Sequence, residues 1–242
     1  MHKSIPINLP STILPIKAFK DNYIWVIHRN EFAVIVDPGE SSQVIEFMDN
    51  SGLKPVAILI THKHYDHIDG VKTILNHYPA IEIYGPAKCS LPFPYKPVKE
   101  GDIVTIKDVE IKYMVIEIPG HTLDHIAYLD NDVLFCGDTL FGCGCGRLFE
   151  GTAEEMYSSL QKIKALNKKT KIYCGHEYTL NNIRFAMTQE VDNLDLTSRY
   201  RKVLKQEVTI PTLLSEELKT NPFMKASSSQ NLKEIRERKD AF

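Results

Sequence analysis

The sequence predicts an α/β fold of layered strands and helices, followed by a smaller C-terminal α-helical domain. Short strand-like segments dominate residues 13–136, and helical spacing occurs between some of them. Side chains that commonly bind metals follow four of the apolar segments directly. Beyond residue 176 the apolar residues recur only at helical spacing. We therefore expect one domain over residues 1–174, with its functional site at the strand ends, and a helical domain over residues 175–242.

Apolar spacing and turn residues place the first elements in order. Residues 13–28 and 31–36 are expected to form a hairpin that turns at residues 29–30, and residues 56–61 a fully buried strand. Helical spacing at residues 40–50 and 69–78, on either side of that strand, indicates a βαβ arrangement. Further strands are expected at residues 81–84, 103–106, 109–116, 126–129 and 133–136.

Helices dominate the remainder of the chain. Thr152 and Glu155 have the spacing of a capping box, which predicts a helix from there to residue 166. Its apolar side carries Met156, Leu160 and Ile163. Three helical patterns follow residue 176, with apolar positions at Leu180, Ile183 and Met187, then Leu196, Tyr200, Val203 and Leu204, then Leu213, Leu214 and Leu218.

The segment at residues 61–70 carries four potential metal ligands directly after an apolar strand. In an extended segment His62 and His64 point the same way, whereas Asp66 and His67, past the bend, can reach a second ion. Crowded imidazoles would repel one another on protonation unless a cation organised them. The pattern therefore predicts a two-metal centre rather than four unrelated packing residues.

Three other apolar stretches end in a potential ligand. His121, Asp138 and His176 each follow a glycine, whose missing Cβ lets the backbone turn sharply toward a crowded centre. Together with the first cluster they give five histidines and two aspartates. This set is large enough for two metal sites if one carboxylate bridges them.

The motifs THKHYDH, PGHT, CGDTLF and CGHEYT resemble the metallo-β-lactamase superfamily and, within it, the hydroxyacylglutathione hydrolases or glyoxalase II enzymes. Residues 21–23, 144–152, 221–224 and 236–240 resemble the narrower family. The resemblance implies an αββα sandwich and two divalent ions per chain, zinc, with iron or manganese as alternatives. It assigns His62, His64 and His121 to the first ion, Asp66, His67 and His176 to the second, and Asp138 to the bridge. Asp66 and Asp138 would be the catalytic residues.

The resemblance also implies an activity. The family hydrolyses S-(2-hydroxyacyl)glutathione, above all S-lactoylglutathione, to glutathione and a 2-hydroxy acid such as D-lactate, in methylglyoxal detoxification. Water activated between two cations is the nucleophile, so no side-chain nucleophile is required. The alternatives are a persulfide dioxygenase-like protein, which uses one iron and consumes oxygen, and another hydrolase of the same fold.

Candidate substrate contacts lie in two places. The resemblance puts Arg147, Phe149 and Tyr178 at the cleft, although Phe149 lacks the hydroxyl of the Tyr found in some relatives. In the expected helix at residues 230–240, Arg236 and Lys239 share the apolar face. Such cations can snorkel on a solvated helix, but the resemblance implies that they bind the carboxylates of glutathione.

Composition limits the other partners. Lys and Arg number 29 against 31 Asp and Glu, for a net charge of -2, so we expect neither nucleic-acid nor membrane binding. Residues 1–20 lack the apolar core of a secretory signal, and we expect a cytoplasmic monomer. The five cysteines include no CxxC pair, which argues against a disulfide framework. For Cys143 and Cys145 we expect two small thiols in a glycine-rich loop rather than a redox or metal site.

Overall fold

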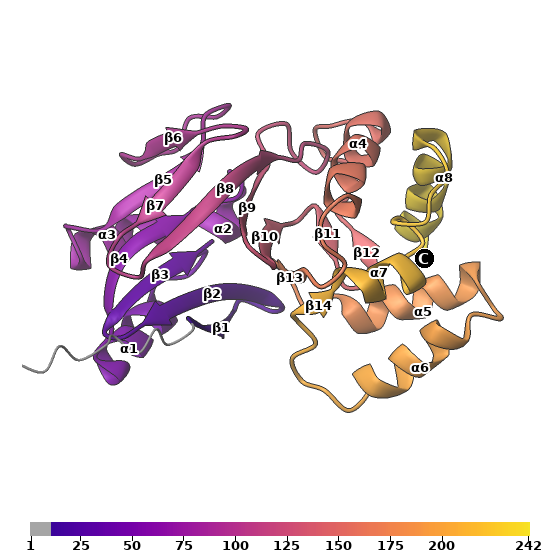
Figure 1. The fold of residues 1–242 in the computed structure, drawn as a ribbon, viewed down its shortest axis with the longest axis horizontal. Helices are drawn as coiled ribbons and strands as arrows, with labels where there is room; N and C mark the ends of the chain where they lie inside the picture. Colours follow the sequence, from indigo (N-terminus) through magenta and orange to yellow (C-terminus); the bar gives the residue numbers. More distant parts are fainter. Residues whose placement is uncertain (1–10) are drawn as a thin grey trace, which may run out of the picture.

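Two six-stranded sheets packed face to face form the centre of the computed structural model, which describes residues 11–242. Helices cover the outer faces of both sheets, and a group of helices lies beyond one of them (Figure 1). The expectation about a secretory signal falls partly on residues 1–10, which lie outside the described residues. No helix in residues 11–242 is long and apolar enough to cross a membrane.

The first sheet has the order β1-β2-β3-β4-β5-β6 and begins with a meander. Its first three strands are antiparallel neighbours, whereas β3 to β6 run parallel. The strands are β1 (Thr12–Ala18), β2 (Asn22–Arg29), β3 (Phe32–Val36), β4 (Lys54–Leu59), β5 (Glu82–Pro86) and β6 (Lys96–Val98). The parallel connections around β4 confirm the expected βαβ arrangement.

The second sheet has the order β14-β13-β10-β9-β8-β7 and is antiparallel except between β10 and β13. Its strands are β7 (Ile103–Ile106), β8 (Ile111–Glu117), β9 (Ile126–Asp130), β10 (Val133–Gly137), β13 (Lys171–Cys174) and β14 (Thr212–Leu213). A separate ribbon of β11 (Leu140–Phe141) and β12 (Gly144–Cys145) follows β10.

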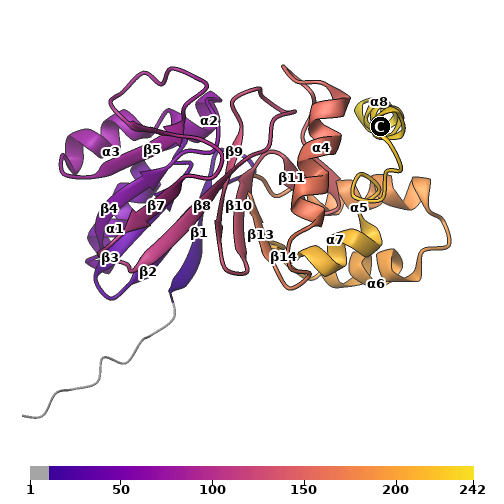
Figure 2. The ribbon, with the colours of Figure 1, turned by 45° about the horizontal axis from the view of Figure 1, so that its top comes forward.

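The helices fall into two groups, which Figure 2 separates clearly. The first group is α1 (Ser42–Ser51), α2 (Tyr65–Ile68) and α3 (Val71–His77), on the first sheet. The second group is α4 (Ala153–Lys164), α5 (Thr179–Gln189), α6 (Leu194–Val203), α7 (Leu214–Thr220) and α8 (Ser229–Asp240). Helix α4 begins with the expected capping box between Thr152 and Glu155 and packs against both the second sheet and α8. The layers confirm the αββα sandwich with a helical C-terminal region.

Strand β2 is apolar at successive positions because both of its faces are buried. Tyr23, Trp25 and Ile27 face the core between the sheets, and Ile24 and Val26 face the core beneath α1 and α3. Both faces of the strand are covered, so apolar residues are required at successive positions. The indole of Trp25 also donates a hydrogen bond of 2.9 Å to the carbonyl of Cys174, which links the two sheets.

The elements differ from the expectations at three places. Residues 13–28 form two strands rather than one, because a left-handed backbone at Phe19 (φ 48°) turns the chain between β1 and β2. The helix expected at residues 69–78 is present as α3, but a separate short helix before it, α2, was not expected, and it carries Asp66 and His67. Beyond residue 176 the spacing is not purely helical, because β14 pairs with β13; a two-residue strand is too short to show a period.

Candidate metal centre and active site

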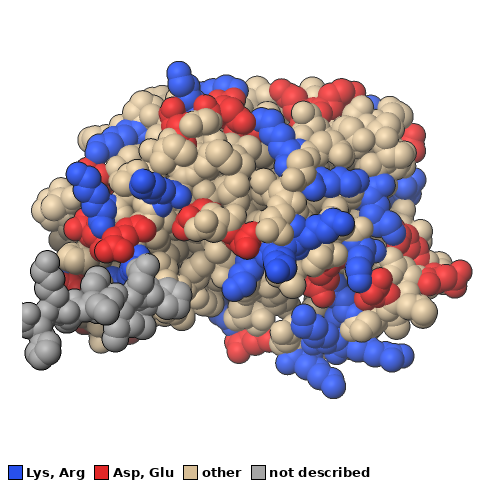
Figure 3. Space-filling model, in the orientation of Figure 1, with Lys and Arg blue, Asp and Glu red and all other residues tan. Residues whose placement is uncertain are grey.

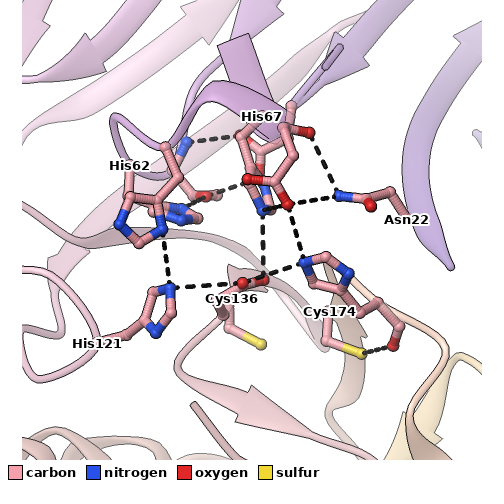
Figure 4. Close-up of polar contacts among 12 residues, drawn as sticks. Asn22, His62, His67, His121, Cys136 and Cys174 are labelled. Atoms are coloured by element: carbon pink, nitrogen blue, oxygen red, sulfur yellow. Dashed lines mark hydrogen bonds and ion pairs between the residues drawn. The ribbon is translucent and has the colours of Figure 1, made fainter. Parts of the chain in front are cut away.

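The seven expected ligands come from the ends of strands in both sheets. His62 and His64 follow β4, and Asp66 and His67 lie on the short helix α2 directly after them. The other three follow strands of the second sheet, namely His121 after β8, Asp138 after β10 and His176 after β13. Figure 4 shows imidazoles and carboxylates from these loops pointing toward one another.

Two groups of potential ligand atoms lie side by side, and a third, of Asp37, His62 and His67, overlaps both. Those of His62, His64 and His121 lie within 4.8 Å of one another, and so do those of Asp66, His67 and His176. These are the two sets that the resemblance implies.

The Asp138 carboxylate lies between the two groups. Its Oδ1 is 3.4 Å from His67 Nε2, and its Oδ2 is 3.2 Å from His176 Nε2 and 3.5 Å from His121 Nε2. One carboxylate oxygen therefore faces the second group alone, while the other is shared between the groups.

Hydrogen bonds on the outer side of the imidazoles orient the rings. His67 Nδ1 contacts Asp37 at 3.1 Å, His176 Nδ1 contacts Asp21 at 2.9 Å, and His121 Nδ1 donates to the Arg147 carbonyl at 2.9 Å. In each case Nε2 is left facing the centre. Such outer partners fix the tautomer and the ring orientation of metal-ligating histidines.

Three of the inner ligand atoms lack hydrogen-bond partners, which is the test of whether metal ions fit. His62 Nε2, His67 Nε2 and Asp138 Oδ1 are buried and have no hydrogen-bond partner among residues 11–242. Buried polar atoms are ordinarily paired. Converging imidazole nitrogens and carboxylate oxygens, three of them unpaired, are suited to divalent metal ions.

The electrostatics of the centre lead to the same conclusion. Burial raises the pKa of Asp138, but His176 and His67 outweigh it and hold the pKa well below its usual range. Burial lowers the pKa of His67, but Asp138 and Asp37 outweigh it and raise the pKa to about 10. The carboxylates around these imidazoles thus favour positive charge at the centre, which divalent ions can supply. His62 is different, because burial and the neighbouring His67 hold its pKa well below the usual value.

Two glycines leave room for this packing. A Cβ on Gly175 would lie 2.5 Å from Asp138 Oδ1 and 2.6 Å from His67 Cε1. Gly137 has a left-handed backbone (φ 46°), which favours glycine. The expected glycine turns before the ligands are thus confirmed at these two positions.

A cavity of about 720 Å³ extends from the ligands to the C-terminal helix α8. Besides the metal cluster it is lined by the expected substrate contacts, Arg147, Phe149, Tyr178, Arg236 and Lys239. Phe149 is exposed, and its ring centroid lies 5.2 Å from that of His121. Tyr178 stacks on His176 with ring centroids 4.7 Å apart. The structure therefore brings all five residues to one cavity beside the ligands.

The cationic end of the cavity contains a well-paired arginine and a lysine, Lys239, whose Nζ donates to the Asn181 carbonyl at 3.5 Å. Arg236 is buried; its Nη1 donates to the Cys145 carbonyl at 2.8 Å, and its Nη2 lies 3.0 Å from Asp240 Oδ1. Lys239 lies over the rings of Phe185 and Phe242. Burial and the nearby Arg236 and Arg147 lower the pKa of Lys239 to about 8. On the face drawn in Figure 3, Lys and Arg side chains gather over the helical half of the protein.

Several residues of the centre were missed in the sequence. Asp37 accepts from the backbone and hydroxyl of Thr61 as well as contacting His67, and His125 Nε2 accepts from the Asp138 backbone at 3.0 Å. Asn22 Nδ2 donates to Asp66 Oδ2 at 3.0 Å. The Asp-Pro-Gly turn after β3 was a signal for Asp37, because a polar residue there also follows a buried strand.

The cysteines of the glycine-rich loop are buried beside this cavity. Cys143 Sγ donates to the Thr220 carbonyl at 3.1 Å, and burial raises the pKa of this thiol. Burial also raises the pKa of Cys145, to about 11, although Arg236 opposes the shift. Neither thiol is disposed to ionise at neutral pH.

Replacing Cys143 and Cys145 together by Ser is expected to leave most of the turnover, because the chemistry needs no thiolate. Steady-state hydrolysis of a thioester substrate by the purified double variant measures this. Mass spectrometry of the wild-type protein mixed rapidly with substrate provides the independent check, since an acyl group on either cysteine would contradict the expectation.

Sequence comparisons agree with this architecture. The profile of the metallo-beta-lactamase superfamily matches residues 19–176, and that of the hydroxyacylglutathione hydrolase C-terminus matches residues 177–242. The hydroxyacylglutathione hydrolase of Nitrosomonas eutropha is 46% identical over 217 residues, which cover 88% of this chain and 85% of that protein. The corresponding protein of Aliivibrio salmonicida is 48% identical over 223 residues, covering 90% and 87%.

Solved structures share the fold at lower identity. ETHE1 from Myxococcus xanthus has a TM-score of 0.70 at 24% identity, covering 95% of this chain and 90% of that one. The BLEG-1 B3 metallo-beta-lactamase has a TM-score of 0.67 at 23% identity, covering 89% and 99%.

The sandwich and its cluster of histidines and aspartates define a metal-dependent hydrolase of the metallo-β-lactamase superfamily. Within that superfamily, the chain belongs to the hydroxyacylglutathione hydrolases, the glyoxalase II enzymes. The resemblance inferred from the motifs is thereby confirmed.

Proposed function

We propose that the protein hydrolyses S-(2-hydroxyacyl)glutathione, with S-lactoylglutathione as its principal substrate, to glutathione and the free 2-hydroxy acid. The observation that carries the proposal is a single cavity with metal-type ligands at one part and cations at another. Glutathione carries two carboxylates, so a thioester at the ligands can place a carboxylate near Lys239 and Arg147. The relatives named above support this substrate.

Two divalent ions, zinc in the first instance, are proposed to occupy the two ligand groups. His62, His64 and His121 would hold one ion, Asp66, His67 and His176 the other, and Asp138 would contact both. When bound, such ions lower the pKa of water and polarise the thioester carbonyl.

The side chains around the ligands are proposed to position the reactants. Asp66, held by Asn22, can accept a hydrogen bond from water and orient it toward the carbonyl. Burial raises the pKa of Tyr178 to about 12, so its hydroxyl stays protonated and can donate to the substrate. The leaving thiol has an ordinary pKa of about 8.5, so the thiolate departs without a strong general acid.

The boundary between the catalytic domain and the glutathione-binding domain is proposed to fall near residue 175. Residues 1–174 supply six of the seven ligands, and residues after that point supply Tyr178, Arg236 and Lys239. In this view the first domain is catalytic and the second binds glutathione.

A direct assay tests the function. Purified protein is incubated with S-lactoylglutathione while thioester loss, free thiol and oxygen are followed, and the same sample is analysed for metals. Stoichiometric thiol release without oxygen uptake, with about two ions per chain, is expected. Oxygen uptake with glutathione persulfide and a single iron would instead identify a dioxygenase.

Lys239→Met is expected to raise KM for S-lactoylglutathione about tenfold, the scale of a hydrogen bond to a charged group, with a smaller fall in kcat. The contact lies far from the scissile bond, so it stabilises substrate and transition state about equally. Lys239 is the better position to change, because Arg236 also supports the backbone of Cys145.

The pH dependence of KM provides a control for the role of Lys239. Below a pKa of about 8 Lys239 is charged in the free protein, and an anionic substrate favours that form. KM should therefore rise as the pH increases through 8 to 9, while Lys239→Arg, which stays charged, should give a flat profile. An identical rise in the Lys239→Arg variant would show that another group titrates.

A further inference from the structure

Lys63 lies between His62 and His64 in the sequence, and its ammonium group contacts two carboxylates from other loops. Its Nζ is 2.9 Å from Glu150 Oε1 and 3.0 Å from Glu150 Oε2. It is also 3.9 Å from Asp124 Oδ1. Asp124 lies in the loop after β8, and Glu150 lies in the loop that precedes α4. One side chain therefore connects the loop after β4 with both of these loops.

The buried carboxylate of Asp124 makes this contact different from an ordinary surface ion pair. The Asp124 side chain is 2% exposed, and neither of its oxygens has a hydrogen-bond partner among residues 11–242. Lys63 is the cation that pairs with it in the described part of the chain. An ion pair between exposed side chains contributes little to stability. Removal of the cation beside a buried carboxylate, in contrast, leaves an uncompensated charge, so we expect the Asp124 loop to shift when Lys63 loses its charge.

The Glu150 carboxylate joins the same loops by further contacts. Besides pairing with Lys63, it accepts a hydrogen bond from the Leu123 amide at 3.2 Å. The Glu150 amide donates to the His121 carbonyl at 3.4 Å, and His121 Nδ1 donates to the Arg147 carbonyl at 2.9 Å. The loop that carries His121 is thus bound to the loop before α4, and Lys63 connects both to the loop after β4.

The ligands on the connected loops are those of the first ligand group, His62, His64 and His121. Figure 4 shows His62 and His121 on neighbouring loops, and His121 Nε2 lies 3.0 Å from His64 Nδ1. A metal site keeps its affinity only if residues behind the ligands hold them in place. We propose that Lys63 is a positioning residue for the first ion, because it holds the loop of His121 against the loop of His62 and His64. This inference rests on the two-ion centre proposed above.

The second ligand group has outer contacts that do not involve Lys63. His67 Nδ1 contacts Asp37, and His176 Nδ1 contacts Asp21. Loss of the Lys63 charge should therefore weaken binding of the first ion and leave the second ion in place. A selective effect of this kind distinguishes the positioning of one metal site from a general loss of structure.

Stepwise removal of metal measures the effect. Zinc-loaded wild-type protein and Lys63→Met are dialysed against increasing concentrations of a chelator, and the ions that remain per chain are counted by elemental analysis. We expect Lys63→Met to lose one ion at a chelator concentration about tenfold below that for wild type, the lower end of what outer partners contribute to metal affinity. The other ion should leave close to the wild-type concentration. Anomalous scattering from crystals of the partly depleted variant should locate the remaining ion at His67 and His176.

Three further variants separate charge from volume. Lys63→Arg keeps a cation and should retain both ions as wild type does. Asp124→Asn removes the buried charge, so its combination with Lys63→Met should recover part of the lost affinity, which would not occur if Lys63 only filled space. Lys96→Met is the matched control, because Lys96 forms an ion pair of 2.6 Å with Glu82 between β6 and β5. This control should retain both ions.

Circular dichroism first establishes that each variant is folded. If Lys63→Met does not fold, Glu150→Gln, which weakens the same ion pair, is measured in its place, and the same selective loss is expected. Simultaneous loss of both ions, or retention of both as in wild type, would overturn the positioning role while leaving the proposed function intact. Wild-type protein that binds no ion at the first ligand group would overturn the two-ion centre and the positioning role with it.

Discussion

Asp138→Ala is expected to lower kcat/KM for S-lactoylglutathione by about a thousandfold or more, the scale of removing a principal electrostatic group from an active site. Its carboxylate oxygens lie within 3.5 Å of the inner nitrogens of His67, His121 and His176, so both ligand groups lose a member. Elemental analysis of the same preparation should show metal lost from both sites.

His121→Ala provides the contrast, because His121 belongs to one ligand group only. That variant should keep metal in the second group while losing most activity. Asp108→Ala changes an exposed aspartate in the turn between β7 and β8 and should match wild type in both measurements. Full metal content in a folded Asp138→Ala protein would contradict the bridging role.

Arg199→Met is expected to lower the free energy of unfolding by about 3–5 kcal/mol, because it leaves a buried carboxylate without its cation. Glu217 is fully buried, and its Oε1 lies 2.5 Å from Arg199 Nη2. The same carboxylate accepts from the Cys143 amide at 2.8 Å and the Asn221 side chain at 2.9 Å. Loss of Arg199 therefore disturbs the contact between α6, α7 and the β11–β12 ribbon.

Urea denaturation followed by circular dichroism measures this effect. Lys202→Met is the matched control, since Lys202 is mostly exposed and lies 3.8 Å from Glu216; its change should stay below about 1 kcal/mol. A similarly small change in Arg199→Met would contradict the expectation that the buried Glu217 depends on this cation.

The ligands could be predicted from the sequence because they lie in short motifs. His62, His64, Asp66 and His67 are close in the chain, and their spacing alone separates the two metal groups. The strands of the sandwich were likewise visible as apolar runs. Short or irregular elements were not, since β6 and β14 are too brief to show a period.

Long-range contacts explain what the sequence did not predict. Helical spacing placed Arg236 on the apolar face of its helix, and the residue is buried as expected. Its bond to the Cys145 carbonyl, 91 residues away in the chain, has no local signal. The same holds for Asp21, which reaches His176 across 155 residues. The strained backbone of Phe19 equally depends on Glu40 rather than on its neighbours in sequence.

The indole of Trp25 gives the protein a built-in optical reporter. It is the single tryptophan in the sequence, and its hydrogen bond ends on Cys174, two residues before His176. The ring also contacts Tyr23 and Tyr173, with centroid distances of 4.9 Å in both cases. Its fluorescence consequently originates from one buried place beside the second ligand group, so a change in emission during metal titration can be read as a local event without any attached label.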